Sequence, residues 1–302
     1  MRGDGDGWVR CSAGHRHWGR YGAAGLLLRD RAAGPEPVDR VVLQHRAWWS
    51  HQGGTWGLPG GARNSEETAV AAALRETAEE AGIEPAAVRP TGVLVDDHGG
   101  WSYSTVVGVP VGLTDPRPTG GESEDVRWVD ADAVETLPLH PGFAATWPWL
   151  RSAPPALLLV VDAANVVGAR GGGDGWWRDR AGATRRLLDA LTPLAGGLPG
   201  AALPPGVAAA RLDLVLPRVL VVVEGAARAV LDDDEDRPVE LVAAPGSGDD
   251  TIVEVAAAAP PGYAALVVTA DRGLRARLAE VGAAAVGPSW LLGLLDSWVD
   301  DR

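Results

Sequence analysis

The chain has 302 residues, of which 46% are hydrophobic and 22% charged, and its mean hydropathy is −0.01. This length suits two ordinary domains better than one, and the composition excludes a wholly disordered chain. The net charge is −13, and both halves are acidic, because residues 1–150 hold 13 Arg against 20 acids and residues 151–302 hold 14 against 20. Neither half therefore has the basic field of a general nucleic-acid-binding protein.

Three further features predict a cytoplasmic protein without a membrane segment. The single cysteine, Cys11, cannot form an internal disulfide framework. The first ten residues carry acids where a signal peptide has a basic region. The longest apolar runs, such as residues 156–161, are far shorter than the ~20 residues that span a bilayer. All 27 basic residues are Arg, which also excludes lysine Schiff-base and P-loop chemistry.

The first polar cluster along the chain is Cys11, His15 and His17. A thiolate and two imidazoles are metal ligands, but structural zinc takes four such groups. The sequence therefore favours a surface or substrate-lid role for this segment over a zinc site.

Five strand-like runs and one strong helix signal follow in the first half. The helix signal covers Glu66–Ala81, and the strands are expected at Gly22–Leu28, Val41–His45, Gly92–Asp96, Ser104–Val109 and Val126–Val129. Strands arranged around a helix in this order predict a mixed α/β or α+β sandwich.

The helix of this half is strongly acidic on one side. Glu76, Glu79 and Glu80 have i, i+3, i+4 spacing, which puts the three carboxylates on one helical face. Such crowding is self-repulsive unless a hard divalent cation uses the oxygens as ligands. Ahead of the helix, Gly60 lies in a turn whose backbone can approach a ligand and offer a carbonyl. Two turns apart on the helix, Glu67 and Arg75 are placed to form an ion pair that braces the site.

Residues 57–83, GLPGGARNSEETAVAAALRETAEEAGI, resemble the Nudix box, G-x5-E-x7-R-E-U-x-E-E-x-G-U. The matching positions are Gly61, Glu67, Arg75, Glu76, Glu79, Glu80, Gly82 and Ile83. Thr77 is the one departure, because the family prefers a bulky aliphatic residue there. We call residues 61–83 the box segment. The resemblance extends over about residues 18–150.

This resemblance implies an α/β/α sandwich with a mixed sheet and the hydrolysis of a nucleoside diphosphate linked to another group. It also implies that Glu76, Glu79 and Glu80 bind Mg²⁺ or Mn²⁺, which would neutralise the pyrophosphate and lower the pKa of an attacking water. Many members take a further carboxylate from a loop before a late strand, where this chain offers Glu122 or Glu124 as ligand or base.

The substrate is less well specified. Trp49, Trp56 and Trp101 lie close to the box in sequence and are candidates for stacking on a base, although Trp is equally common in protein cores. By analogy, the family resemblance favours a nucleoside triphosphate, including oxidised forms.

A boundary is expected at residues 151–155, Arg-Ser-Ala-Pro-Pro, between a domain at 1–150 and another at 156–302. Uniformly apolar runs then alternate with helical stretches, which predicts a mainly parallel sheet covered on both faces. The strands are expected at Leu157–Val161, Val219–Val223, Val239–Ala243, Ala264–Thr269 and Ala283–Val286, and helices at Arg180–Leu191, Thr251–Ala258 and Gly273–Val281. The Gly/Pro/Ala-rich stretch 193–210 is expected to be a loop.

Acidic residues follow several of these strands. They are Asp162 with Asn165, then Glu224, Asp249 with Asp250, and Asp271. The carboxyl ends of parallel strands converge on one crevice, so the acids together predict a two-metal site. Taken singly, each acid could equally be a loop residue or a helix cap.

The segments VVDAANVVG, GSGDDTIVE and VVTADRGL resemble the NYN branch of PIN-like nucleases over about residues 156–292. The resemblance implies metal-dependent RNA cleavage, with metal bound by Asp162, Asp249 or Asp250, and Asp271, with Asn165 positioning and with Glu224 as a fourth acid. A cluster of Arg residues beside Trp176 and Trp177 could hold single-stranded RNA, or could be a solvated helix face. The cluster consists of Arg170, Arg178, Arg180, Arg185 and Arg186.

The sequence thus predicts an α/β protein that fuses a Nudix pyrophosphohydrolase to a PIN-like domain, with no prediction of oligomeric state. Two alternatives stay open. The Nudix-like half could sense a nucleotide and regulate the second half, or the second half could be a non-catalytic interaction module. The complete set of Glu76, Glu79 and Glu80 favours catalysis over sensing.

Overall fold

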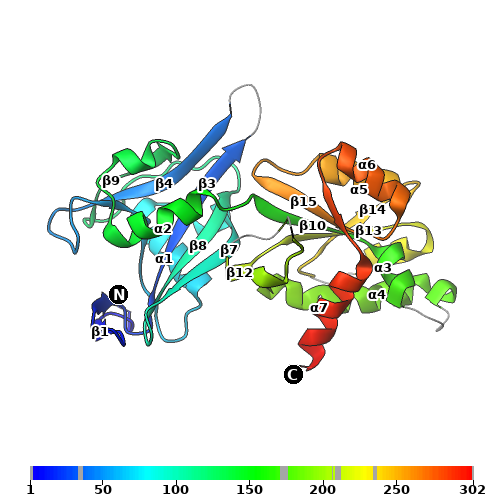
Figure 1. Cartoon of the computed structure of the whole chain (residues 1–302), viewed down its shortest axis with the longest axis horizontal. Helices are drawn as coiled ribbons and strands as arrows, with labels where there is room; N and C mark the ends of the chain where they lie inside the picture. The colour runs from blue at the N-terminus through cyan, green and yellow to red at the C-terminus, as the bar shows by residue number, and fades with distance from the viewer. Residues whose placement is uncertain are drawn as a thin grey trace. The chain divides into compact units, whose positions relative to one another are not determined.

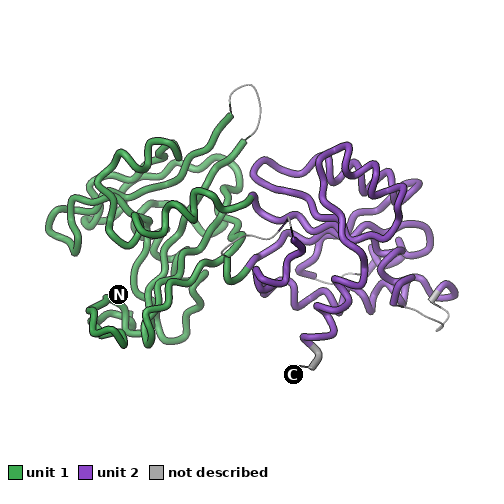
Figure 2. The backbone as a smooth tube through the Cα atoms, in the orientation of Figure 1, with its two compact units in different colours: residues 1–154, 209–214 green, residues 155–208, 215–302 purple. Residues whose placement is uncertain are grey.

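The computed structural model describes residues 3–32, 37–170, 176–205, 207, 212–233 and 237–300. The chain forms two compact units (Figure 2). The first comprises residues 1–154 with 209–214, and the second comprises residues 155–208 with 215–302. Within the described part of the chain, no helix is both long enough and apolar enough to cross a bilayer.

The first unit contains a mixed β-sheet (Figure 1). Its long strands are β3 (Ala23–Ala32), β4 (Val38–Arg46), β7 (Val88–Asp97), β8 (Ser102–Pro110) and β9 (Ser123–Asp130). Shorter ones are β5 (Trp56–Gly57), β6 (Gly60–Ala62) and β12 (Leu214–Val215). Strand β3 is parallel to β8, whereas β7–β8, β3–β4 and β4–β9 are antiparallel, so the predicted mixed sheet is confirmed.

One helix covers each face of this sheet. Alternate residues of the central strands point to opposite sides, so that Leu26 and Leu28 pack with helix α1 (Ala69–Ala81) while Leu27 packs with α2 (Pro141–Arg151). Helix α2 contributes the buried side chains Phe143, Trp147 and Leu150. The result is the α/β/α sandwich expected from the sequence.

Helix α1 begins at Ala69, three residues later than the predicted Glu66. The reason is its cap, because the Thr68 hydroxyl accepts a hydrogen bond from the Ala71 N–H at 3.1 Å and the preceding residues form a turn. The helix ends at Gly82, which has the left-handed φ of 65° that favours glycine. Thr77, which departs from the Nudix pattern, is buried and donates its hydroxyl to the Ala73 carbonyl at 2.7 Å, so the packing position is filled without an unpaired polar group.

A small hairpin that the sequence did not predict precedes the sheet. It consists of β1 (Trp8–Arg10) and β2 (Arg16–Trp18), paired antiparallel. Its turn contains Cys11 and His15.

The second unit contains a five-stranded, fully parallel sheet in the order β14-β13-β10-β15-β16. The strands are β10 (Ala156–Asp162), β13 (Arg218–Val223), β14 (Glu240–Ala243), β15 (Tyr263–Val268) and β16 (Ala284–Val286), close to the five predicted runs. Helices α5 (Gly248–Ala257) and α6 (Arg272–Glu280) pack on one face, where Ile252, Ala256, Leu274 and Leu278 join the core. Helices α3 (Ala163–Arg170), α4 (Arg180–Leu191) and α7 (Pro288–Asp300) lie on the other side (Figure 1).

The division of the chain differs from the predicted one in two respects. Helix α2 continues to Arg151, and the next residues are bound to β3, because Arg29 donates to the Leu150 and Arg151 carbonyls and Arg31 donates to the Ala153 carbonyl. Residues 212–214, expected in the second domain, complete the first unit. The Asp213 N–H donates to the Val93 carbonyl at 2.9 Å, and the Asp213 carboxylate accepts from the Val95 N–H at 2.7 Å.

The stretch predicted as a loop at 193–210 contains short ordered elements in its described part. They are the 3₁₀ turns Thr192–Gly196 and Gly200–Ala202 and the strand β11 (Leu198–Pro199). Leu194 and Leu198 are fully buried, and they anchor the segment despite its many glycines.

Candidate functional site

An ion pair connects the start of the box segment to its helix. Arg75 donates from Nε and Nη2 to the two carboxylate oxygens of Glu67 at 2.8 and 2.9 Å, and from Nη2 to the Ala62 carbonyl at 2.9 Å. Glu67 also accepts from the Asn64 N–H at 3.1 Å, and these bonds hold the pKa of its carboxyl below the usual range. The predicted brace between Glu67 and Arg75 is therefore present, and it fixes the turn before α1 against the helix.

The three helix acids lie at graded depth. The side chains of Glu76 and Glu79 are 16% and 62% exposed, and both approach Nη1 of Arg75, at 2.7 and 3.6 Å. Glu80 lies deeper and accepts from the Gly60 N–H at 2.8 Å. Burial raises the pKa of Glu80 to about 7, against the opposing effect of its hydrogen bonds. Burial raises the pKa of Glu76 as well, with a further contribution from the negative charge of Glu79.

Two glycines of the turn before the helix have no room for a side chain. A side chain at Gly61 would place its Cβ 2.7 Å from the carboxyl carbon and Oε1 of Glu76. A Cβ at Gly60 would lie 2.4 Å from the Ala24 carbonyl oxygen, across the β3–β6 pairing. Glycine at position 61 therefore leaves room for the Glu76 carboxylate, and glycine at position 60 allows the turn to pack closely against β3.

The donor set suits a hard divalent cation. It offers carboxylate oxygens at different depths, one of them beside a backbone turn, and the charge of a cation would offset the cost of keeping buried acids ionised. Tyr103 adds to this environment, because its hydroxyl is buried near Glu80 and its pKa is raised by burial and by that negative charge. Tyr103 is not among the residues singled out from the sequence, and its place beside Glu80 follows from the parallel pairing of β8 with β3.

The two candidate loop acids differ in their surroundings. Glu124 accepts from the Trp48 N–H at 3.3 Å, and its other carboxylate oxygen lies 3.3 Å from Nδ1 of His45. Glu122 is exposed just before β9, and its backbone carbonyl accepts from the Ala47 N–H. Only Glu122 lies on the loop before the late strand, as expected; Glu124 instead lies within β9, which pairs with β4. Both acids lie near residues 45–48, and Glu122 has the freer side chain.

The three candidate stacking tryptophans occupy different environments. Trp49 is 57% exposed. Trp56 is buried and stacks on His45 with 4.9 Å between ring centroids, while Arg127 covers it at 4.7 Å. Trp101 is also buried, stacks on His17 at 4.0 Å and donates from Nε1 to the Gly19 carbonyl. Of these three rings, Trp49 has the open surface that a base could cover.

The part of the chain that contains the box segment is similar to known proteins. The family model of the NUDIX domain matches residues 20–151. A protein of Mycobacterium tuberculosis (strain CDC 1551 / Oshkosh) named "Putative 8-oxo-dGTP diphosphatase 3" is 54% identical over 166 residues, which are 53% of this chain and 75% of that protein. This chain belongs to the Nudix family. It is therefore a hydrolase that acts on acid anhydrides in phosphorus-containing compounds.

Two further relatives cover the Nudix unit. A "Nucleoside triphosphate pyrophosphatase/Nudix hydrolase fusion protein" of Bifidobacterium longum (strain NCC 2705) is 43% identical over 146 residues, which are 48% of this chain and 30% of that protein. The crystal structure of a Nudix hydrolase from M. smegmatis, RenU, is 48% identical and covers 49% of this chain and 93% of that one, with a TM-score of 0.45. The PIN-like identity of the second unit stays a prediction.

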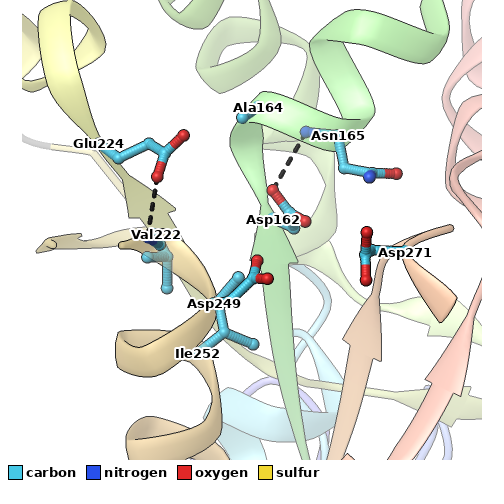
Figure 3. Close-up of a pocket in the computed structure, with 9 residues that line it drawn as sticks. Asp162, Ala164, Asn165, Val222, Glu224, Asp249, Ile252 and Asp271 are labelled. Carbon is cyan, nitrogen blue, oxygen red and sulfur yellow. Dashed lines mark hydrogen bonds between the residues drawn. The ribbon is translucent and has the colours of Figure 1, made fainter. Parts of the chain in front are cut away.

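The second unit has a pocket of about 240 Å³ at the carboxyl ends of its strands (Figure 3). Its polar lining consists of Asp162, Asn165, Glu224, Asp249 and Asp271. Figure 3 shows their side chains directed around one space, although they come from four different strand-to-helix connections. This is the convergence that parallel topology predicts for residues just beyond the strand ends.

Most of these acids also have a partner within the protein. Asp162 accepts from the Asn165 N–H at 3.0 Å and from the Thr269 hydroxyl at 2.9 Å. Asp271 caps α6 by accepting from the Leu274 N–H at 2.7 Å, and Glu224 accepts from the Gly248 N–H at 2.8 Å. Sequence reasoning did not single out Thr269, which is buried at the end of β15 and lies close to Asp271 in the signature VVTADRGL.

Asp249 and Asp250 differ in their electrostatic surroundings. Burial raises the pKa of Asp249, and so do Asp271, Glu224 and Asp250. Burial likewise raises the pKa of Asp162, with added repulsion from Asp249 and Glu224. Asp250 instead lies outside the pocket lining and accepts from Nη2 of Arg277 at 2.7 Å. The structure therefore places Asp249, rather than Asp250, with the other acids.

The basic cluster proposed for RNA is partly neutralised by acids of its own unit. Arg185 forms a bidentate pair with Asp233 at 2.8 and 2.9 Å, and Arg170 lies 3.5 Å from Asp296. The side chain of Trp176 lies outside the described residues.

Proposed function

We propose that the Nudix unit hydrolyses a nucleoside triphosphate, or another substrate built on a nucleoside diphosphate, with Mg²⁺ or Mn²⁺ held by Glu76, Glu79 and Glu80. The carbonyl of Gly60 is proposed as a further ligand. The observation that carries the proposal is the position of three carboxylates beside a glycine turn that the Glu67–Arg75 pair holds against the helix. The proposal extends the family assignment to a metal and a substrate class.

Other residues of the site would position these metal ligands. Arg75 orients Glu67 and Glu76, and the Gly60 N–H holds Glu80 in place. Gly61 leaves space at the Glu76 carboxylate. A divalent cation bound there would neutralise the pyrophosphate charge and lower the pKa of an attacking water. Glu122 or Glu124 is proposed as a further ligand or as the base. Of the two, Glu122 is favoured, because its side chain is exposed whereas that of Glu124 accepts a hydrogen bond from the Trp48 N–H.

We propose an oxidised purine nucleoside triphosphate as the first substrate to test. The support is the name of the M. tuberculosis relative, "Putative 8-oxo-dGTP diphosphatase 3", at 54% identity. The exposed ring of Trp49 offers a surface for stacking on a purine, and a Trp49→Ala variant should raise KM more than it lowers kcat.

The decisive test is hydrolysis by the purified chain of nucleoside triphosphates, oxidised forms, sugar nucleotides and dinucleotides with Mg²⁺ or Mn²⁺. Glu79→Gln and Glu80→Gln should abolish turnover, because an amide of the same size cannot supply the charge that holds the cation. Glu66→Gln, an exposed acid of the same box segment, is the matched control. If both amide variants keep wild-type turnover, this metal site is wrong. If the wild type binds nucleotides without turnover, the sensing alternative replaces catalysis.

We propose, as a second function, that the acidic pocket of the other unit binds divalent cations for RNA cleavage, as in PIN-like nucleases of the NYN branch. Asp162, Asp249 and Asp271 would hold the metal, Asn165 would position the substrate, and Glu224 would be a fourth acid. The support is the convergence of these side chains on one pocket at the strand ends. Burial and the neighbouring acids raise the pKa of both Asp162 and Asp249, and a bound cation would offset the cost of keeping them ionised.

The test compares single acids of this pocket in the full chain. Asp162→Asn and Asp249→Asn should remove RNA cleavage and reduce the rise in Tm on adding Mn²⁺, whereas hydrolysis of nucleotides should be unchanged. Asp250→Asn should behave like the wild type, because its side chain pairs with Arg277 outside the pocket lining. Glu280→Gln at the exposed end of α6 serves as the control. If the wild type cleaves no RNA and Asp162→Asn leaves the Mn²⁺ shift intact, the interaction-module alternative is favoured.

A further inference from the structure

The first unit contains a second cluster of metal-ligating side chains, separate from the box segment. It consists of Cys11, His15, His17 and His98. One ligand atom from each of these four residues can be chosen so that all lie within 4.8 Å of one another. Three residues come from the β1–β2 hairpin, and His98 comes from the turn between β7 and β8. The structure thus supplies the fourth ligand that the segment 11–17 lacks by itself.

Backbone hydrogen bonds bring the two turns together. Within the hairpin, the Cys11 N–H donates to the His15 carbonyl at 3.1 Å, and the Gly14 N–H donates back to the Cys11 carbonyl at 2.9 Å. Between the turns, the Ser12 N–H donates to the Gly99 carbonyl at 2.8 Å, and the Ser12 hydroxyl donates to the His98 carbonyl at 3.1 Å. The cluster is therefore built by backbone contacts and not by chance proximity of mobile side chains.

The side chains of the cluster are held in ways typical of metal ligands. Cys11 is 5% exposed and packs with Trp101. The ring of His17 stacks on Trp101, and its Nε2 is buried without a hydrogen-bond partner in the described structure. His98 Nε2 lies 3.2 Å from the Asp96 carboxylate, the kind of contact that orients a ligating imidazole and leaves its other ring nitrogen available. The Cys11 thiol and Nε2 of His17 are thus both placed to bind an ion.

We propose that Cys11, His15, His17 and His98 form a structural zinc site. A thiolate with imidazoles is a borderline-soft donor set that suits Zn²⁺, unlike the all-oxygen set of the box segment. Four protein ligands fill a tetrahedron and leave no position for water, so the site is structural and not catalytic. Bonds of about 2.0–2.3 Å would set the ligand atoms roughly 3.4 Å apart, so small rotations of the side chains would close the present spacing.

The site would fix the N-terminal segment that contacts the box segment. Before the hairpin, the Gly5 N–H donates to Oδ1 of Asn64 at 3.3 Å, and the Asp4 carboxylate accepts from the Ser65 N–H at 3.1 Å. The Asn64 N–H in turn donates to Glu67. Loss of zinc would therefore free the hairpin and weaken the support of the turn that carries Glu67. Faster hydrogen exchange at residues 4–18 and 63–67 should accompany removal of zinc by a chelator.

The sole cysteine gives this proposal a site-specific readout. The full chain, purified with zinc and freed of loosely bound ions, should hold one zinc per chain by elemental analysis. Replacement by Co²⁺ should produce the visible absorption of tetrahedral cobalt and a near-ultraviolet thiolate-to-cobalt charge-transfer band. Only Cys11 can produce that band, so carboxylate sites elsewhere in the chain do not interfere.

Variants then identify the ligands. Cys11→Ser should lose the charge-transfer band, and His98→Ala should weaken zinc binding by an order of magnitude or more, since even the loss of a residue that only orients a ligand costs about 10–100-fold. His51→Ala, an exposed histidine of the same unit, is the control and should bind zinc like the wild type. The proposal is overturned if the reconstituted wild type holds no tightly bound zinc, if its Co²⁺ form lacks the thiolate band, or if a folded His98→Ala variant binds zinc with wild-type affinity. The wild-type spectrum decides the matter even where a variant fails to fold.

Discussion

Replacing Arg75 with Gln should destabilise the Nudix unit far more than an ordinary surface change. Arg75 makes four hydrogen bonds, two to Glu67 and one each to Glu76 and the Ala62 carbonyl, and glutamine is too short and too weak a donor to replace them. The side chains of Glu67 and Glu76 are only 14% and 16% exposed, so both would lose their cationic partner in a largely buried setting. Breaking a fully buried ion pair costs ~3–5 kcal/mol, and because Arg75 itself is 30% exposed we expect about 2–4 kcal/mol.

For a unit of this size that loss corresponds to a fall in Tm on the order of 10 °C. Tryptophan fluorescence can follow it in the full chain, because nine of the 13 tryptophans precede residue 150. Arg117→Gln is the matched control, since Arg117 is 66% exposed and lies 3.9 Å from an exposed Asp115. Adding Glu67→Gln to Arg75→Gln should recover part of the loss, because it removes the stranded charge. Equal, small shifts for Arg75→Gln and Arg117→Gln would refute the structural role of the brace.

Three further results are expected. Burial lowers the pKa of His140 to about 4, so between pH 4 and 6.5 the unfolded chain binds the proton that the folded chain excludes. The contribution of His140 to the free energy of unfolding should therefore fall by roughly 1–2 kcal/mol as the pH drops below about 6.5, after allowance for partial exposure. Glu80, with its pKa raised to about 7, changes stability in the opposite sense over the same range, so the difference between urea titrations of the wild type and of His140→Gln isolates the histidine. Gly61→Ala should reduce nucleotide hydrolysis by crowding Glu76, while Gly121→Ala, whose added Cβ would meet no atom within 4 Å, should leave turnover unchanged. Asp213→Ala should lower the free energy of unfolding by about 1 kcal/mol, because it removes the hydrogen bond to the Val95 N–H. The exposed-site variant Asp115→Ala is the control, and an equal Tm for the two variants would contradict this prediction.

The sequence predicts best those elements whose local residue pattern directly reflects their burial in the fold. Val219–Val223 is apolar at every position because β13 lies inside a parallel sheet covered on both faces, and the run therefore marks the strand within one residue. The box segment behaves in the same way, because Glu67, Arg75 and Glu76 meet through the geometry of one turn and one helix.

The features that escape prediction depend on residues distant in sequence. His98 joins Cys11 only because the β7–β8 turn binds the β1–β2 turn, which no spacing rule contains. Asp213 lies just after the stretch 193–210 and within the predicted second domain, although its bonds to Val93 and Val95 extend the sheet of the first unit. The choice of Asp249 over Asp250 is likewise decided by Arg277, which is brought beside Asp250 by the packing of α6 on α5.

The return of residues 212–214 to the Nudix unit affects how the protein is made on the ribosome. Strand β7 pairs on one side with β8, and its other side is closed by β12, which is synthesised only after residues 155–211. At roughly 5–20 residues per second, we expect the nascent Nudix unit to spend seconds with this edge of β7 unpaired and open to other nascent chains. Translation rate over this stretch should therefore influence the yield of correctly assembled protein, even where the codons specify the same amino acids.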